Sequence, residues 1–167
     1  MTATAVITAG GTGTRLGLNT PKQFLSVLNK PILIHTLEAF QKAESIDKIV
    51  VVLPSEELHR LDSNAQKQFG LNKVVTVIRG GTTRQASVQA GLEAIDWKTD
   101  FVAIHDAARC LVTPKLINQT VQACKGWDGA IAALAIIDTL KRVQGETIQK
   151  TEPRDNIWAM QTPQVFT

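Results

Sequence analysis

The sequence contains no tyrosine, and only 5% of its 167 residues are aromatic. It also has no block of lysine and arginine, although 18 basic and 15 acidic residues give a net charge of +3. Aromatic platforms and clustered basic side chains are what proteins use to hold nucleic acids. We therefore expect no nucleic-acid partner, and the mild positive charge favours a small anionic ligand.

Long apolar runs are also missing. The longest uninterrupted run extends from about Ala130 to Ile137, whereas a helix needs roughly 20 apolar residues to cross a bilayer. The first residues are typical of a strand and do not form the basic and apolar leader of an exported protein. We expect a soluble, cytoplasmic protein that has no membrane partner.

Cysteine is scarce. Cys110 and Cys124 match neither a CxxC pattern nor a Cys/His metal spacing, and we interpret them as two reduced thiols of a cytosolic protein. The rest of the composition, 44% apolar and 20% charged, excludes a disordered tail, a collagen and a coiled coil. The length suits a single domain over residues 1–167, because domains average about 150 residues.

Apolar runs alternate with segments of helical period along the chain. Strands that are apolar throughout indicate burial on both faces, as in a parallel sheet covered by helices. The sequence therefore predicts an α/β domain with a doubly wound, mostly parallel sheet and helices on both faces. The predicted strands are Ala3–Thr8, Lys48–Leu53, Lys73–Ile78, Phe101–His105 and Ala130–Ile137, and the predicted helices are Pro31–Lys42, Glu56–Phe69, Thr83–Ile95 and Thr113–Lys125.

A polar segment, residues 138–151, follows the last apolar run. It contains LKRV and TIQK on either side of Gln144 and Gly145, which predicts a hairpin of two short polar strands. Because an isolated two-stranded hairpin is marginally stable in water, this segment is expected to need a partner.

Three unusual loops follow predicted strands. AGGTGTR (residues 9–15) comes after the first strand, GGTTR (80–84) after the third, and HDAAR (105–109) after the fourth. In a doubly wound sheet, ligands bind beyond the carboxyl ends of the strands, where the strand order reverses. The sequence therefore predicts a ligand site formed by these loops.

The glycines of the first loop allow backbone N–H groups to approach phosphate oxygens closely. The loop lacks the GxxxxGK[ST] pattern of a Walker A sequence, and Leu16 breaks a GxGxxG dinucleotide pattern. It is therefore neither an ordinary kinase loop nor a dehydrogenase loop. A glycine-rich turn that binds nothing is the remaining alternative.

Charged residues near these loops indicate phosphoryl chemistry. Arg15 and Lys22 provide two cations beyond the first loop, which suits a reaction that builds negative charge on phosphorus. Asp106 follows a buried strand and could ligate Mg²⁺ or hold a ribose hydroxyl. We interpret His105 as a structural hydrogen-bonding residue, and no Ser/His/Asp arrangement or GxSxG motif points to a nucleophile.

Together these motifs resemble those of the 2-C-methyl-D-erythritol 4-phosphate cytidylyltransferases of the non-mevalonate isoprenoid pathway. AGGTGTRLG and PKQFL are shared by many sugar-nucleotide pyrophosphorylases, so they indicate only the superfamily. The narrower motifs are GGTTRQASVQAGL, HDAAR, DTLKRV and TEPRDNIWAMQTPQVF. The resemblance implies a Rossmann-like nucleotidyltransferase fold with a protruding β-hairpin arm.

The resemblance also implies a reaction and its site residues. CMP would pass from CTP to 2-C-methyl-D-erythritol 4-phosphate with Mg²⁺ as the cofactor, giving CDP-methylerythritol and pyrophosphate. The implied catalytic residues are Arg15, Lys22 and Arg154; the nucleotide-binding residues are Ala9, Gly10, Gly11, Thr12, Gly13, Gly81, Ser87, Asp106 and Ala107, with Asp106 also binding the metal; and the substrate-binding residues are Arg109, Thr139, Arg154 and Thr162.

In the same family, a hairpin like the one at residues 138–151 hooks around a second subunit. The resemblance therefore implies a homodimer in which Arg154 of one chain serves the site of the other.

The chain departs from the family pattern at three places. Cys110 stands where proline is usual, and Thr82 stands where many members have an acidic residue. The chain also ends at Thr167, before a TDxxS segment and an NxKIT strand that supply a metal-binding aspartate and a lysine. We therefore expect a C-terminally incomplete domain, and two alternatives stay open: a cytidylyltransferase for ribitol 5-phosphate or another alditol phosphate, and a non-catalytic CTP-binding module.

Overall fold

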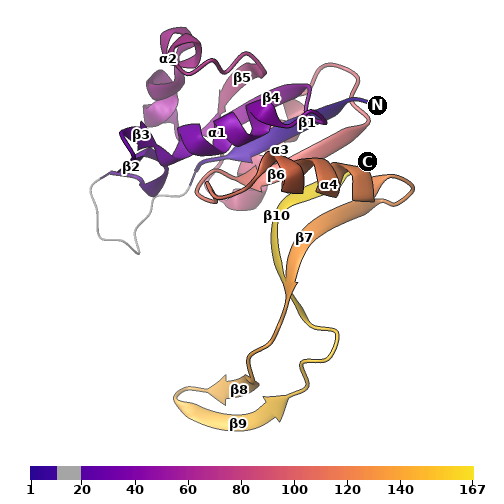
Figure 1. Cartoon of the computed structure of the whole chain (residues 1–167). Helices are drawn as coiled ribbons and strands as arrows, with labels where there is room; N and C mark the ends of the chain where they lie inside the picture. Colours follow the sequence, from indigo (N-terminus) through magenta and orange to yellow (C-terminus); the bar gives the residue numbers. More distant parts are fainter. Residues whose placement is uncertain (11–19) are drawn as a thin grey trace.

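A six-stranded sheet forms the centre of the molecule, with strand order β5-β4-β1-β6-β10-β7 (Figure 1). The computed structural model describes residues 1–10 and 20–167. The sheet strands are β1 (Ala3–Thr8), β4 (Lys48–Leu53), β5 (Val74–Arg79), β6 (Phe101–Asp106), β7 (Gly129–Ala135) and β10 (Trp158–Phe166). The helices are α1 (Ile32–Lys42), α2 (Ser63–Gln68), α3 (Arg84–Glu93) and α4 (Pro114–Cys124), with the 3₁₀ segments η2 (Lys22–Phe24) and η3 (Ser55–Leu61).

Most of the sheet is parallel, as predicted. β1 pairs in parallel with β4 on one side and with β6 on the other, and β4 pairs in parallel with β5. β10 lies antiparallel to both β6 and β7. The strand order reverses at β1, because the chain first builds outward through β4 and β5 and then returns to place β6 on the other side.

Helices cover both faces of the sheet, which confirms the doubly wound arrangement. Along β1, Ala5 and Ile7 belong to the larger core that contains the buried side chains of α1 and α4. Val6, between them, belongs to a smaller cluster on the side of α3. This alternation is the period of two that a strand buried on both faces requires.

The helix starts follow capping chemistry. The Thr83 hydroxyl accepts a hydrogen bond from the backbone N–H of Ala86 and begins α3, and Thr113 caps α4 through Leu116 in the same way. Each bond satisfies one of the donors that the first turn of a helix leaves free. In the described residues, no helix has the length and apolar content that a bilayer-spanning segment needs.

The prediction of one continuous helix over Glu56–Phe69 is wrong. The segment instead forms η3, then turns at Asp62, and continues as α2. The Asp62 carboxylate accepts a hydrogen bond from the N–H of Ala65, so this residue caps a new helix. An aspartate favours such a cap over the interior of a continuous helix.

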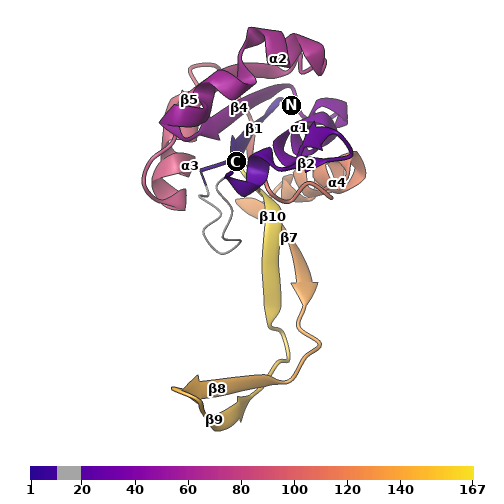
Figure 2. The same cartoon turned by 90° about the vertical axis from the view of Figure 1, so that its left-hand side faces the viewer.

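The prediction of a doubly buried strand at Ala130–Ile137 is also incorrect. β7 ends at Ala135, it is the outermost strand of the sheet, and the Leu134 side chain is 65% exposed. Figure 2 shows β7 and β10 leaving the sheet together as a two-stranded stalk. The second half of the apolar run therefore lies in the stalk, where helices do not cover it.

Two short hairpins complete the fold. β2 (Ser26–Val27) and β3 (Lys30–Pro31) form a small hairpin ahead of α1. At the end of the stalk, β8 (Leu140–Gln144) pairs with β9 (Thr147–Glu152), as the sequence predicted for the polar segment. We call this second hairpin the arm, and it projects away from the sheet (Figures 1 and 2).

β10 was not predicted from the sequence. It pairs with β7 through Trp158–Met160 and again through Gln164–Phe166, with a register shift between the two parts. Residues 161–163 form this irregularity, which we call the β10 bulge, and it contains a cis peptide bond between Thr162 and Pro163. The bulge lies where the strand passes from the stalk into the sheet.

Candidate functional site

A pocket of about 640 Å³ opens at the carboxyl ends of the parallel strands. It lies at the reversal of strand order, because Thr8 at the end of β1 pairs with Asp106 at the end of β6. This is the position that the sequence predicted for a ligand site. The described residues that line it are Thr8, Ala9, Gly10, Lys22, Gln23, Gly81, Thr82, Thr83, Arg84, Ser87, Asp106, Ala108 and Arg109.

The GGTTR loop packs too closely against α3 for side chains at its glycines. A Cβ atom on Gly80 would lie 2.8 Å from Ser87 Oγ, and one on Gly81 would lie 2.4 Å from the Ala86 Cβ. The buried Ser87 hydroxyl donates to the carbonyl oxygens of Gly81 and Thr83. The loop is thereby held against the first turn of α3.

The N-terminal end of α3 faces the pocket, since Thr82, Thr83 and Arg84 line it. Backbone N–H groups in the first turn of a helix and the helix dipole favour a negatively charged ligand. The same wall carries the Arg84 guanidinium. This side of the pocket is therefore suited to a phosphate group.

Lys22 reaches the pocket from η2, which is fixed to the end of β1. The side-chain amide of the buried residue Gln23 donates to the carbonyl oxygen of Ala9 at 2.6 Å. The N–H of Ala9 in turn donates to the carbonyl of Val52 in β4 at 2.8 Å. Lys22 and the start of the glycine-rich loop are thus attached to the same part of the sheet.

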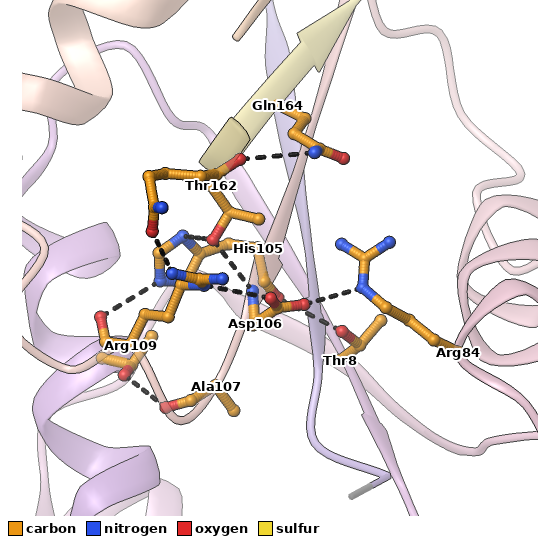
Figure 3. A network of polar contacts seen from close by, with 10 residues as sticks. Thr8, Arg84, His105, Asp106, Ala107, Arg109, Thr162 and Gln164 are labelled. Atoms are coloured by element: carbon orange, nitrogen blue, oxygen red, sulfur yellow. Dashed lines mark hydrogen bonds and ion pairs between the residues drawn. The ribbon is translucent and has the colours of Figure 1, made fainter. Parts of the chain in front are cut away.

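Asp106 is bound by two arginines (Figure 3). Its Oδ1 accepts from Arg84 Nε at 2.9 Å, and its Oδ2 accepts from Arg109 Nε at 3.1 Å. Burial alone would raise the pKa of the Asp106 carboxyl, but the hydrogen bonds and charges of Arg84 and Arg109 outweigh burial and keep this pKa below its ordinary value. The carboxylate is therefore ionised at neutral pH.

His105 lies beneath Asp106 and is completely buried. Its Nδ1 is 2.9 Å from the Thr162 hydroxyl, and its Nε2 is 3.3 Å from the carbonyl oxygen of Arg109. Burial lowers the pKa of His105 to about 4, so the imidazole is neutral at pH 7. Its ring also packs on Phe40 at a centroid distance of 4.9 Å. The geometry agrees with the interpretation of His105 as a hydrogen-bonding structural residue.

The structure brings many of the predicted site residues together around the pocket: Ala9, Gly10, Lys22, Gly81, Ser87, Asp106 and Arg109. Gly11, Thr12, Gly13 and Arg15 lie outside the described residues. The roles predicted for all of these residues stay predictions.

Four predicted residues lie outside this lining in the described part of the chain. Ala107 is buried, and its backbone bonds to Thr8 and Thr36. Thr162 is also buried, with its hydroxyl shared by Asp106 and His105. Thr139 lies between β7 and β8 and Arg154 between β9 and β10, so both belong to the protruding part of the molecule (Figure 1).

Sequence reasoning missed Thr8, Gln23 and Arg84 as residues of the site. Arg84 is the residue that a motif-based argument could have found, because it ends the GGTTR loop as Arg109 ends HDAAR. Gln23 is harder to identify from the sequence, because its role depends on a hydrogen bond to the Ala9 carbonyl that exists only in the folded protein.

The pocket contains one residue that suits a hard divalent cation. Asp106 is the only acidic side chain among the described lining residues, and no group of three or more His, Cys, Asp or Glu side chains gathers in the described ranges. Mg²⁺ is commonly held by one or two carboxylates together with phosphate oxygens of a substrate. Asp106 therefore fits a metal that binds together with a nucleotide.

Comparison with known sequences agrees with this geometry. A family model described as 2-C-methyl-D-erythritol 4-phosphate cytidylyltransferase matches residues 3–167. An enzyme of that name from Geotalea uraniireducens is 40% identical over 168 residues, covering 99% of this chain and 72% of that protein. Another from Rubrobacter xylanophilus is 42% identical over 166 residues, covering 98% of this chain and 69% of that protein.

Solved structures of similar enzymes share the fold. The 2-C-methyl-D-erythritol 4-phosphate cytidylyltransferase of Francisella tularensis superposes with a TM-score of 0.78 at 32% identity, covering 99% of this chain and 72% of that chain. The 4-diphosphocytidyl-2C-methyl-D-erythritol synthase of Anaerococcus prevotii gives a TM-score of 0.81 at 26% identity, covering 99% and 70%.

Proposed function

This chain belongs to the 2-C-methyl-D-erythritol 4-phosphate cytidylyltransferase family, and on that basis we propose that it transfers CMP from CTP to 2-C-methyl-D-erythritol 4-phosphate. An oxygen of the substrate phosphate attacks the α-phosphorus of CTP. The bond from that phosphorus to the β-phosphate oxygen breaks, and pyrophosphate leaves. The observation that carries the proposal is one pocket that joins the loops after β1, β5 and β6 around an ionised carboxylate and three cations.

The nucleotide occupies the side of the pocket formed by the first loop and the start of α3. Gly10 and Gly81 allow the backbone to approach the ligand closely, and Ser87 holds the GGTTR loop in place. Thr83 and Arg84 at the start of α3 line the same space, where a helix N-terminus favours the triphosphate charge. The cytosine is bound near Gly81 and Ser87.

Lys22, Arg84 and Arg109 supply positive charge around the reacting phosphates. Phosphoryl transfer needs little covalent chemistry from a protein, because most of the barrier is lowered by positioning and by charge stabilisation. Lys22 is fixed through Gln23 and the Ala9 carbonyl, so its charge requires little reorganisation in the transition state. Arg15 acts with Lys22 in this role.

Asp106 is the lining residue that would hold Mg²⁺. The bound metal would neutralise phosphate charge and polarise the phosphoryl group. The Asp106 carboxyl is ionised without a metal, because Arg84 and Arg109 hold its pKa low. The two arginines therefore keep the carboxylate charged and lie beside the phosphates.

The arm binds a second copy of the chain. β8 and β9 pair with each other, and Val143 and Ile148, which face each other across the hairpin, are 53% and 62% exposed. A two-stranded hairpin with exposed apolar side chains gains stability when a partner covers it. In such a dimer, Thr139 and Arg154 come close to the other subunit's pocket and orient the polyol phosphate there.

The assay is pyrophosphate release from CTP, with 2-C-methyl-D-erythritol 4-phosphate and ribitol 5-phosphate as competing acceptors. Turnover that needs both Mg²⁺ and the methylerythritol substrate supports the proposal. Faster turnover of ribitol 5-phosphate would replace it with the other alditol phosphate activity. CTP binding without pyrophosphate release from either acceptor would indicate a non-catalytic nucleotide-binding module.

A further inference from the structure

The β10 bulge connects the arm to the chemistry of the pocket. Before the bulge, β10 pairs with β7 in the stalk, and after it, Gln164–Phe166 pair with both β6 and β7. An irregularity of this kind redirects side chains that would otherwise alternate between the faces of the sheet. In this chain, Gln161 and Thr162 turn toward the HDAAR loop.

Both charged residues of that loop are attached to the bulge. The Arg109 guanidinium donates to the Gln161 side-chain oxygen, and the backbone N–H of Asp106 donates to Thr162 Oγ1 at 3.3 Å. Arg109 Nε also donates to Asp106 Oδ2. The bulge therefore holds Arg109 by its side chain and Asp106 by its backbone (Figure 3).

The hydrogen bonds around His105 have one consistent direction. Thr162 Oγ1 accepts a hydrogen bond from the backbone N–H of Asp106, so its own O–H is free to donate to His105 Nδ1 at 2.9 Å. A neutral imidazole that accepts at Nδ1 carries its proton on Nε2. That N–H donates to the carbonyl oxygen of Arg109 at 3.3 Å, and the chain of bonds returns to the same loop.

These hydrogen bonds are costly to lose because they are buried. His105 is 0% exposed and Thr162 is 6% exposed, so water is poorly placed to replace either partner. A buried polar group that loses its partner retains the cost of having left water. Loss of the Thr162 bond is therefore expected to move Asp106, and loss of the His105 Nε2 bond is expected to move Arg109.

We propose that His105 and Thr162 are positioning residues, which set Asp106 and Arg109 through the HDAAR loop and do not touch the substrate. The proposal rests on the proposed function, in which Asp106 binds the metal and Arg109 lies beside the phosphates. It also gives Thr162 a role different from the direct substrate contact that the resemblance implied.

The first test compares Thr162→Val with Thr162→Ser. Valine has nearly the shape of threonine but cannot bond to Asp106 or His105, whereas serine keeps the hydroxyl. Mn²⁺ binding, measured by electron paramagnetic resonance with and without CTP, is expected to weaken about tenfold or more in Thr162→Val, as for other changes behind a metal ligand. Thr162→Ser is expected to bind Mn²⁺ as the unmodified protein does.

The second test uses His105→Asn. The asparagine side chain can still accept a hydrogen bond from Thr162, but it is too short to reach the Arg109 carbonyl. This variant is expected to raise the KM for the polyol phosphate more than it weakens Mn²⁺ binding, because the Arg109 carbonyl loses its hydrogen bond while the Asp106 N–H keeps its bond to Thr162. Equal changes in the two quantities would contradict separate positioning of the two residues.

A third measurement does not depend on activity. Nitrogen-15 NMR of the imidazole is expected to show the neutral form with the proton on Nε2, and a proton on Nδ1 would overturn the proposal. So would a folded Thr162→Val variant with unchanged Mn²⁺ affinity and unchanged kcat. If Thr162→Val does not fold, the His105→Asn kinetics and the NMR result test the proposal instead.

Failure of the proposed function would look different. In that case the unmodified protein would bind Mn²⁺ and CTP without releasing pyrophosphate, while Thr162→Val would still bind Mn²⁺ more weakly than Thr162→Ser does. An unmodified protein that binds no Mn²⁺ even with CTP would contradict both proposals.

Discussion

The Arg84 guanidinium at the start of α3 donates to the Asp106 carboxylate at the end of β6, with an Nε–Oδ1 distance of 2.9 Å. This ion pair joins the GGTTR and HDAAR loops, and both residues line the pocket. If Asp106 holds a divalent cation as proposed, that cation would compete with Arg84 for Oδ1 of the carboxylate.

Replacing Arg84 should separate metal binding from turnover. In Arg84→Gln, the affinity for Mn²⁺ without nucleotide is expected to increase, because a competing cation has been removed. The kcat is expected to fall, because a positive charge beside the phosphates is lost. Because the pair is partly exposed, unfolding free energy should change by no more than about 1 kcal/mol, as measured by urea denaturation.

A matched control for that experiment is Lys30→Gln. Lys30 forms an ion pair with Glu38 at 2.6 Å, and neither residue is among the described lining of the pocket. The control is expected to leave Mn²⁺ affinity and kcat unchanged. Weaker Mn²⁺ binding in Arg84→Gln would show that the arginine supports the metal.

Lys22→Ala should reduce turnover far more than nucleotide affinity. The charge of Lys22 is expected to act mainly on the transition state, so kcat should fall on the order of a hundredfold, as on loss of a preorganised donor to a transition-state oxyanion. Calorimetry with CTP and Mg²⁺ gives the affinity for comparison. Comparable losses of kcat and affinity would assign Lys22 to ground-state binding.

Gly81→Ala should damage the pocket from the loop side. The new methyl group would lie 2.4 Å from the Ala86 Cβ, so either the GGTTR loop or the first turn of α3 must shift. Overpacking of this kind typically costs about 1–3 kcal/mol. Urea denaturation should show this loss and calorimetry a weaker affinity for CTP, and a variant with unchanged CTP affinity would remove Gly81 from the nucleotide site.

The arm can be tested by the mass of the protein in solution. If the arm binds a second copy, Ile148→Asp places a charge in the covered surface and should shift sedimentation equilibrium toward the monomer. The control is Leu28→Asp, since Leu28 is 88% exposed and lies in the turn between β2 and β3. Equal masses for both variants and the unmodified protein would exclude the arm as the dimer contact.

The two cysteines should differ in reactivity. Cys124 is fully buried, and burial raises the pKa of its thiol, whereas Cys110 is partly exposed. Thiolates are the reactive form, so a thiol reagent should label Cys110 first and Cys124 only on unfolding. In Cys110→Ser the fast labelling phase should disappear, and its persistence would mean that Cys124 is accessible in the folded protein.

The elements predicted best are those whose local sequence pattern is compatible with only one kind of secondary structure. Lys48–Leu53 is found with its predicted bounds, because a short β-branched run ended by Pro54 has few alternatives to a buried strand. β10 was not predicted, because residues 161–163, the β10 bulge, interrupt the strand pattern. The role of the bulge is visible only from its contacts with the HDAAR loop.

The candidate site likewise has a part that the sequence predicts and a part that it does not. Loops after β1, β5 and β6 could be placed at one edge of the sheet from the order of strands and motifs alone. The partners within the site could not, because Arg84 lies 22 residues and Thr162 lies 56 residues from Asp106. Contacts at such separations depend on how the sheet closes, which the local sequence does not specify.

The late position of β10 in the chain has a consequence for how the protein forms. β1, β4, β5 and β6 can assemble first, and with them the three loops of the pocket. The contacts of Thr162 with Asp106 and His105 must wait for a strand that follows the whole arm. Since contacts distant along the chain carry a larger entropic cost of closure and tend to form slowly, the hydrogen bonds that fix the HDAAR loop should be among the last to form.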